Sequence, residues 1–129
     1  MINIIKLFIK ILSFISLFDR ELTMSVTPWS SGNCTITDSS KYAAFIITVN
    51  SYPIIAIRDG DLISGFSVTA SASLENIRSF SARTNGDIWT LSYSYSLRHT
   101  ASGSHNAMED STTYSISKVV GLVPSAILS

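Results

Sequence analysis

The segment 79–97, SFSARTNGDIWTLSYSYSL, contains the clearest fold signal in the chain. From Trp89 to Leu97, apolar or aromatic residues alternate with polar ones. This period of two predicts a β-strand with one apolar face and one polar face. Asn85-Gly86 precedes the strand, and both residues tolerate the positive φ angles that a two-residue type I′ turn requires. We therefore predict an antiparallel hairpin with Asn85-Gly86 as its loop.

A two-residue loop also fixes which residues of the two strands face each other. Counting outward from the loop, Thr84 pairs with Asp87 and Ala82 with Trp89. The apolar faces of the two strands then coincide, and the small Ala82 leaves room for the indole ring. Cross-strand pairs of this kind stabilise a sheet by up to about 1 kcal/mol.

The composition indicates one folded domain and gives no reason to expect a nucleic-acid partner. The chain has 129 residues, of which 46% are hydrophobic and 14% are charged, and a disordered chain would be less apolar. The formal net charge is zero and lysine and arginine form no cluster. The single Cys34 excludes an internal disulfide, which favours a cytosolic protein or a component of a larger assembly.

Short alternating segments separated by turn signals continue through the rest of the chain. This spacing predicts an all-β fold, an antiparallel β-sandwich of jelly-roll or immunoglobulin-like type over residues 24–129, with about seven short strands. The predicted strands are Cys34–Asp38, Ala43–Val49, Tyr52–Ile57, Leu62–Ala70, Ile77–Thr84, Trp89–Leu97 and Thr112–Val120.

Two stretches lack the strand pattern. Thr100–Ser111 is rich in serine, glycine and asparagine, which predicts the longest exposed loop of the domain. Ser71–Asn76 is the one place where a short helical turn is expected.

Two neighbouring strands are apolar on both faces. Ala43–Val49 and Tyr52–Ile57 have almost no polar alternation, which predicts strands in the middle of a sandwich or at a contact between subunits. In the following strand Phe66 and Val68 share the apolar face, and Gly65 is expected to mark a β-bulge.

Residues 1–23 differ in character from the rest of the chain. Met1–Phe18 is an apolar run with Lys6 and Lys10 near its start, and we expect an apolar helical extension that contributes nothing to the β-domain. Three interpretations stay open: a signal peptide without an evident cleavage site, a membrane anchor shorter than the usual span of about 20 residues, and a misassigned start upstream of Met24. The expected location is the virion or cytoplasm if translation starts at Met24, and the membrane or the exterior if residues 1–23 are retained.

The sequence predicts no catalytic residues, no metal site and no cofactor. The spacing of His99 and His105 matches no known metal-ligand motif. Asp59, Asp61 and Asp87 each neighbour a glycine, and a turn explains these carboxylates more simply than calcium does. A G-x-S-x-G nucleophile motif and a phosphate-binding glycine loop are both missing from the sequence. We therefore predict a protein that is not an enzyme.

Aromatic residues of the central hairpin give the candidate ligand-binding residues. These are Trp89, Tyr93 and Tyr95, together with His99 and His105 beside the predicted polar loop. An aromatic platform for a sugar can be formed by Tyr93, Tyr95, Tyr52, Trp89 and Trp29, which gives the hypothesis of a carbohydrate-binding, lectin-like module. The alternation also fits an aromatic core face, because large apolar side chains are most often buried. Both interpretations stay open.

Two segments resemble a group of known proteins. Tyr52–Arg58 (YPIIAIR) and Gly86–Leu91 (GDIWTL) are similar to segments of small β-rich proteins encoded near tail-fibre genes of lambda-like phages and prophages. The resemblance includes no catalytic motif. It implies a virion or tail-associated accessory protein that acts in assembly or surface attachment.

Two function hypotheses follow. The first is a non-enzymatic structural or interaction protein, oligomeric and associated with a phage or prophage tail. The second is the carbohydrate-binding module of a secreted or surface protein. The expected partners are other proteins or further copies of the chain, with a glycan under the second hypothesis and a membrane only if residues 1–23 are retained.

Overall fold

The computed structural model describes residues 3–7, 19–49, 51–70, 74–102, 105–113 and 115–125. At residues 70, 74, 75, 93, 95–102 and 105–113 this description covers the backbone alone. A short helix spans residues 3–7, where a helical extension was predicted, and exposes Ile4, Ile5 and Leu7. In the described part of the chain no helix is both long enough and apolar enough to cross a membrane.

The remaining described residues form nine β-strands and one turn of 3₁₀ helix. These are β1 (Arg20–Glu21), β2 (Asn33–Thr35), η1 (Ser39–Lys41), β3 (Tyr42–Val49), β4 (Tyr52–Asp59), β5 (Leu62–Ala70), β6 (Leu74–Asn85), β7 (Ile88–Ser102), β8 (His105–Thr113) and β9 (Ile116–Pro124).

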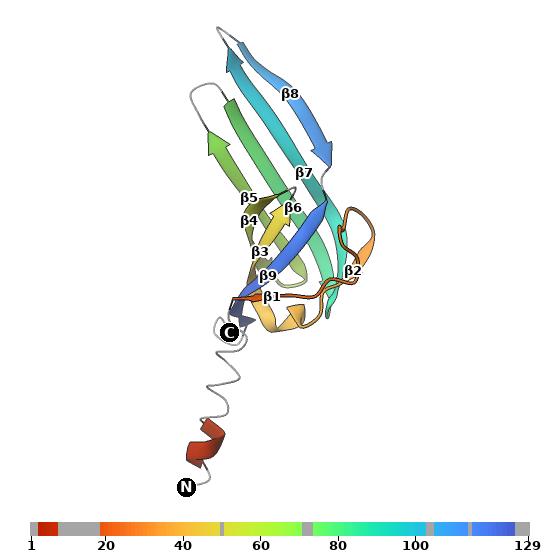
Figure 1. The fold of residues 1–129 in the computed structure, drawn as a ribbon, viewed down its shortest axis with the longest axis vertical. Helices are drawn as coiled ribbons and strands as arrows, with labels where there is room; N and C mark the ends of the chain where they lie inside the picture. The colour runs from red at the N-terminus through yellow and green to blue at the C-terminus, as the bar shows by residue number, and fades with distance from the viewer. Residues whose placement is uncertain are drawn as a thin grey trace.

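Every strand pair in the described part of the chain is antiparallel. The strands follow the order β1-β9-β3-β4-β5-β6-β7-β2, and β8 pairs with the far end of β7. The predicted all-β antiparallel fold is therefore confirmed. A sandwich of about seven strands is not confirmed, because the nine described strands belong to one continuous curled sheet (Figure 1).

The sheet has a curled part and an extension. Figure 1 shows β1, β2, β3, β4 and β9 wrapped around one end of the molecule, while β5, β6, β7 and β8 continue beyond them. We call this four-stranded extension, residues 66–70, 74–80, 93–102 and 105–113, the blade.

Trp89 lies at the centre of the core inside the curled part. Its ring meets Trp29 and Phe45 edge to face, with ring centroids 6.3 and 5.0 Å apart, and Phe80 in a tilted arrangement at 6.2 Å. None of the four rings is more than 1% exposed. Each aromatic pair of this kind adds about 0.5–1.5 kcal/mol to the stabilisation that burial provides.

The predicted hairpin is present as β6 and β7, but its turn and register differ from the prediction. Thr84, not Ala82, pairs with Trp89, so the two loop residues are Gly86 and Asp87. Of these two only Gly86 has a positive φ, +60°, which is the arrangement of a type II′ turn and not of the predicted type I′ turn. A glycine at the first loop position moves the turn by one residue, which changes each cross-strand partner by two residues: Trp89 faces Thr84 and not Ala82.

A β-bulge interrupts the alternation that predicted one apolar face along β7. The residues on either side of Ser92 pair with consecutive residues of β6, so Ser92 is an extra residue. One extra residue exchanges the two faces of a strand. Ser94, which the pattern placed on the polar face, is accordingly buried with 3% exposure. The prediction of a single apolar face from Trp89 to Leu97 is therefore wrong.

β4 and β5 pair only next to the hairpin that joins them. Their pairs begin at Asp59–Leu62 and end at Ala56–Gly65. A Cβ atom on Gly65 would lie 2.1 Å from the carbonyl oxygen of Ile55, far closer than any real contact. The predicted bulge at Gly65 is wrong, because β5 keeps an unbroken register with β6 through this residue. Gly65 is instead the residue at which the backbones of β4 and β5 approach each other most closely and their pairing ends. We call this point the corner.

Beyond the corner, the two strands follow different neighbours. β4 continues along β3 to its first residue, Tyr52, and β5 continues along β6 to Ala70. The guanidinium carbon of Arg78, in β6, lies 3.4 Å from the centre of the Tyr52 ring. The start of β4 therefore reaches β6 directly, and β5 does not separate the two.

The predicted exposed loop Thr100–Ser111 is wrong. β7 continues to Ser102 and β8 occupies His105–Thr113, and the two pair along this length. The period-two apolar pattern is missing here because this part of the blade extends beyond the core (Figure 1). The predicted helical turn is also wrong over residues 74–76, which belong to β6, while 71–73 lie outside the described residues.

The β-domain begins before Met24. Arg20 and Glu21 pair with β9, and Leu22 is a core residue with 4% exposure whose N–H donates to the carbonyl of Val119. The expectation that residues 1–23 contribute nothing to the domain is therefore wrong for Arg20–Leu22. A pattern search misses so short a strand, because two residues carry no periodicity.

The corner at Gly65 gives a direct prediction. Gly65→Ala should lower the free energy of unfolding by about 2–3 kcal/mol, since the methyl group collides with backbone atoms that cannot move independently. Urea denaturation measures the difference. The control is Ser64→Ala at the neighbouring exposed position, which should stay within about 0.5 kcal/mol of wild type. Equal stability of Gly65→Ala and Ser64→Ala would contradict the close approach of β4.

Candidate interaction surface

Trp89, the first of the predicted ligand-binding residues, is part of the core. Its side chain is 0% exposed, and its indole N–H donates to the hydroxyl oxygen of Ser39 at 2.8 Å. Trp29 is equally buried. Neither ring can stack on a sugar at the surface, so the aromatic platform loses both of its tryptophans.

The other four candidate residues are placed by their backbone only. Tyr93 and Tyr95 pair with Ser81 and Ser79 of β6, beyond the β-bulge. His99 lies further along β7 opposite Met108, and His105 begins β8 opposite Ser102. The side chains of Tyr93, Tyr95, His99 and His105 lie outside the described residues, so their role in ligand binding stays a prediction.

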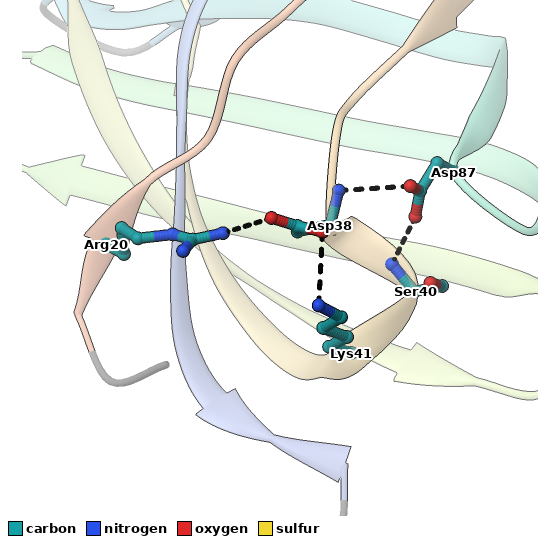
Figure 2. A network of polar contacts seen from close by, with 5 residues as sticks. All are labelled: Arg20, Asp38, Ser40, Lys41 and Asp87. Carbon is teal, nitrogen blue, oxygen red and sulfur yellow. Dashed lines mark hydrogen bonds and ion pairs between the residues drawn. The ribbon is translucent and has the colours of Figure 1, made fainter. Parts of the chain in front are cut away.

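At the end of the sheet away from the blade, polar side chains connect the β6–β7 turn to η1 through hydrogen bonds. Figure 2 shows the carboxylate of Asp87, in the β6–β7 turn, accepting the backbone N–H groups of Asp38 and Ser40 at 3.0 and 2.8 Å. Burial alone would raise the pKa of Asp87, but these hydrogen bonds outweigh it and lower the pKa. The carboxylate therefore ties η1 to the turn that β6 and β7 share.

Asp38 extends the same network to β1. Its carboxylate accepts a hydrogen bond from Arg20 and pairs with Lys41 at 3.2 Å (Figure 2). These two partners, Arg20 first, lower the pKa of Asp38. Because β1 has only two residues, this ion pair supplements a short run of backbone bonds.

Arg58 holds the backbone around η1 from the other side. Its guanidinium donates to the carbonyls of Tyr42 and Ser39 at 2.9 and 3.0 Å and to the hydroxyl of Thr84 at 3.0 Å. Burial lowers the pKa of Arg58, while the nearby Asp87 raises it. All of these groups are engaged with the chain itself, which assigns them a structural role.

The described residues provide little for chemistry. Cys34 is 1% exposed, and its thiol lies 3.7 Å from the carbonyl oxygen of Val26, so it is a core residue. Among the described residues no three His, Cys, Asp or Glu side chains gather closely enough to hold a metal ion.

The most unusual feature of the described surface is an apolar face on β4 and β5. Ile55 and Ile57 of β4 are 63% and 58% exposed, and Phe66 and Val68 of β5 are 69% and 51% exposed. We call these four residues the β4–β5 apolar face. Single exposed apolar residues are ordinary, but a group of large ones on adjacent strands marks an interaction site.

A hollow lies beside three of the four residues of this face, Ile55, Ile57 and Phe66. It has a volume of about 480 Å³, and its other lining residues are Ser64, Gly65, Ser79 and Phe80. Ile46 of β3, which is half-buried, pairs with Ile55 and continues the apolar surface across the sheet. The hollow arises where β4 and β5 part.

The sequence located this surface in part. Tyr52–Ile57 was predicted to be covered on both faces, in the middle of a sandwich or at a contact between subunits, whereas Ile55 and Ile57 are exposed in the described structure. Phe66 and Val68 were correctly placed on one shared face, which is the exposed one. The sequence did not predict the hollow. The hollow forms because β4 and β5 separate after Gly65, and the local sequence pattern does not indicate that separation.

Comparison with known proteins provides no further guide. The chain matches no model of a known protein family, no curated protein and no solved structure.

The hydrogen bonds of the Asp87 carboxylate predict how the free energy of unfolding depends on pH. Asp87→Asn should lower the free energy of unfolding by about 1 kcal/mol near neutral pH, because a neutral amide accepts two N–H bonds less strongly than a carboxylate does. The folded pKa lies below the usual 3.8, so this contribution is complete above 3.8 and disappears as the pH falls through the lowered folded value. Wild type and Asp87→Asn should therefore converge in strong acid.

Urea denaturation of both proteins over a pH series measures this convergence. The control is Asp59→Asn, at the exposed last residue of β4, which should match wild type within about 0.5 kcal/mol. A difference between wild type and Asp87→Asn that stays constant across the series would show that the carboxylate charge is not what holds η1.

Proposed function

We propose that this chain is a non-enzymatic structural or interaction protein that self-associates and assembles through the β4–β5 apolar face. The observation that carries the proposal is the exposure of Ile55, Ile57, Phe66 and Val68 on two adjacent strands. Burying a large apolar side chain contributes about 1.5–3 kcal/mol. A contact that covers even part of this face therefore has a substantial driving force.

The chemistry of the described residues agrees with this proposal. The braced polar groups at the turns hold the chain together, and the one thiol is buried. What the described surface offers instead is apolar area beside a hollow about as large as a few side chains, 480 Å³. Such a surface fits another protein surface better than a polar small molecule.

The segment Tyr52–Arg58 adds a second line of support. It is one of the two segments that resemble tail-associated proteins of lambda-like phages, and it forms most of β4, including the exposed Ile55 and Ile57. A tail-associated assembly role therefore involves the same strand as the apolar face. We include that role in the proposal.

The carbohydrate-binding alternative has lost its strongest residues. With Trp29 and Trp89 both buried, a sugar platform would depend on Tyr93 and Tyr95. No described contact favours a glycan over a protein at those positions, so we retain the protein-interaction function.

The test is the mass of the full-length chain in solution. Size-exclusion chromatography with light scattering, at increasing protein concentration, should show species larger than the 14.0 kDa monomer. The double variant Ile57→Ser/Phe66→Ser should shift the mass toward the monomer while the melting temperature is retained. Ile88→Ser, at a 44% exposed isoleucine on β7 outside the face, should associate like wild type. A chain that stays monomeric at all concentrations contradicts the proposal.

A further inference from the structure

The blade has a free edge along β5. Between Phe66 and Ala70 the backbone of β5 pairs with β6 on one side, and no described strand pairs with it on the other, since its pairing to β4 ends at Gly65. An unpaired edge presents N–H and C=O groups that another strand can bind. Phe66, Val68 and Thr69 on this edge are exposed, and Ser67 is partly exposed.

The free edge lacks the features that keep strand edges apart. Its sequence, FSVTA, has no charged residue and no proline, and it is rich in residues that favour strands. The opposite edge of the blade, β8, differs, because Glu109 and Asp110 lie near its middle. Two β8 edges brought together would place like charges against each other. Of the two blade edges, β5 is the one suited to pairing.

The edge sequence is also complementary to itself. In an antiparallel pair centred on Val68, the large Phe66 of one copy faces the small Ala70 of the other, and Ser67 faces Thr69. Val68 then faces Val68, and Phe66 and Val68 lie on the exposed face of both strands. Apolar residues meet apolar ones and hydroxyls meet hydroxyls, with no charge left unpaired.

We propose that two copies of this chain pair their β5 edges, antiparallel and centred on Val68, to form one continuous sheet across a two-fold axis. This pairing is isologous, so it closes as a dimer and leaves no β5 edge for a further copy. The inference rests on the proposed function and deepens it, because it names the partner as a second copy and the contact as residues 66–70. The hollow at the corner, beside Phe66, lies next to this contact.

A cross-linking experiment tests the register. Val68→Cys in the full-length chain should form a disulfide-linked dimer under mild oxidation, because directly opposed residues have Cβ atoms about 4.5–5.5 Å apart, close to disulfide distance. Thr69→Cys, the exposed neighbour, should cross-link much less, since Thr69 faces Ser67 and not itself. Cys34 is 1% exposed and should add little background, which the wild-type chain measures.

A charge variant tests whether the edge contributes to affinity. Val68→Lys should weaken dimerisation at least tenfold in sedimentation velocity, because two lysines then face each other across the axis. Val26→Lys, at a 46% exposed valine away from β5, should dimerise like wild type. Both variants should keep the wild-type circular dichroism.

The outcomes separate this inference from the broader proposal. Efficient cross-linking through Val68→Cys together with a weakened Val68→Lys dimer supports the paired edge. Self-association that persists in Val68→Lys and is lost in Ile57→Ser/Phe66→Ser overturns the edge pairing and leaves the apolar face as the contact. A chain that is monomeric under every condition overturns both. Cross-linking that is equal at Val68 and Thr69 contradicts the register.

Discussion

The rest of the structure depends on the close approach of β4 to β5 at Gly65. A side chain at this position would overlap the carbonyl of Ile55, so only glycine lets the two backbones meet. After the corner, β4 turns with β3 over the core and its Tyr52 reaches Arg78 of β6. β5 continues into the blade without β4. The curled core, the exposed apolar face and the free edge all result from the separation of β4 and β5 after Gly65.

The aromatic core around Trp89 and the hydrogen bonds of Asp87 and Arg58 stabilise the curled part of the sheet, which contains this corner. Trp89 lies at the centre of the core, and its indole N–H donates to Ser39, so this large side chain is buried without an unpaired donor. Asp87 and Arg58 then fix the backbone around η1 through bonds to N–H and C=O groups. Asp87, which the sequence predicted to be a turn residue, and Arg58 both use their hydrogen-bonding capacity within the fold.

The local sequence pattern predicted where most strands lie, but it did not predict their register, the change of faces in β7 or the free edge of β5. Continuous apolar runs predicted β3 and β4, and the glycine turn predicted the hairpin of β6 and β7. The register was missed because glycine at the first loop position moves the turn by one residue. The change of faces was missed because nothing in the sequence distinguishes Ser92 from the serines at the next polar positions, Ser94 and Ser96. β8 was missed because its strand has no core to cover, and the free edge because it depends on a long-range event at Gly65.

Hydrogen–deuterium exchange of the full-length chain at low and high protein concentration tests most directly whether the β5 edge is open and then occupied. At high dilution, amides in 66–70 that point away from β6 should exchange quickly, while those of Ile54 and Ala56, inside the β3–β4 ladder and the core, exchange slowly. At high concentration the 66–70 amides should become protected and Ile54 and Ala56 should not change. Equal protection of 66–70 at both concentrations would show that this edge is either covered within the monomer or never occupied, and would contradict the account.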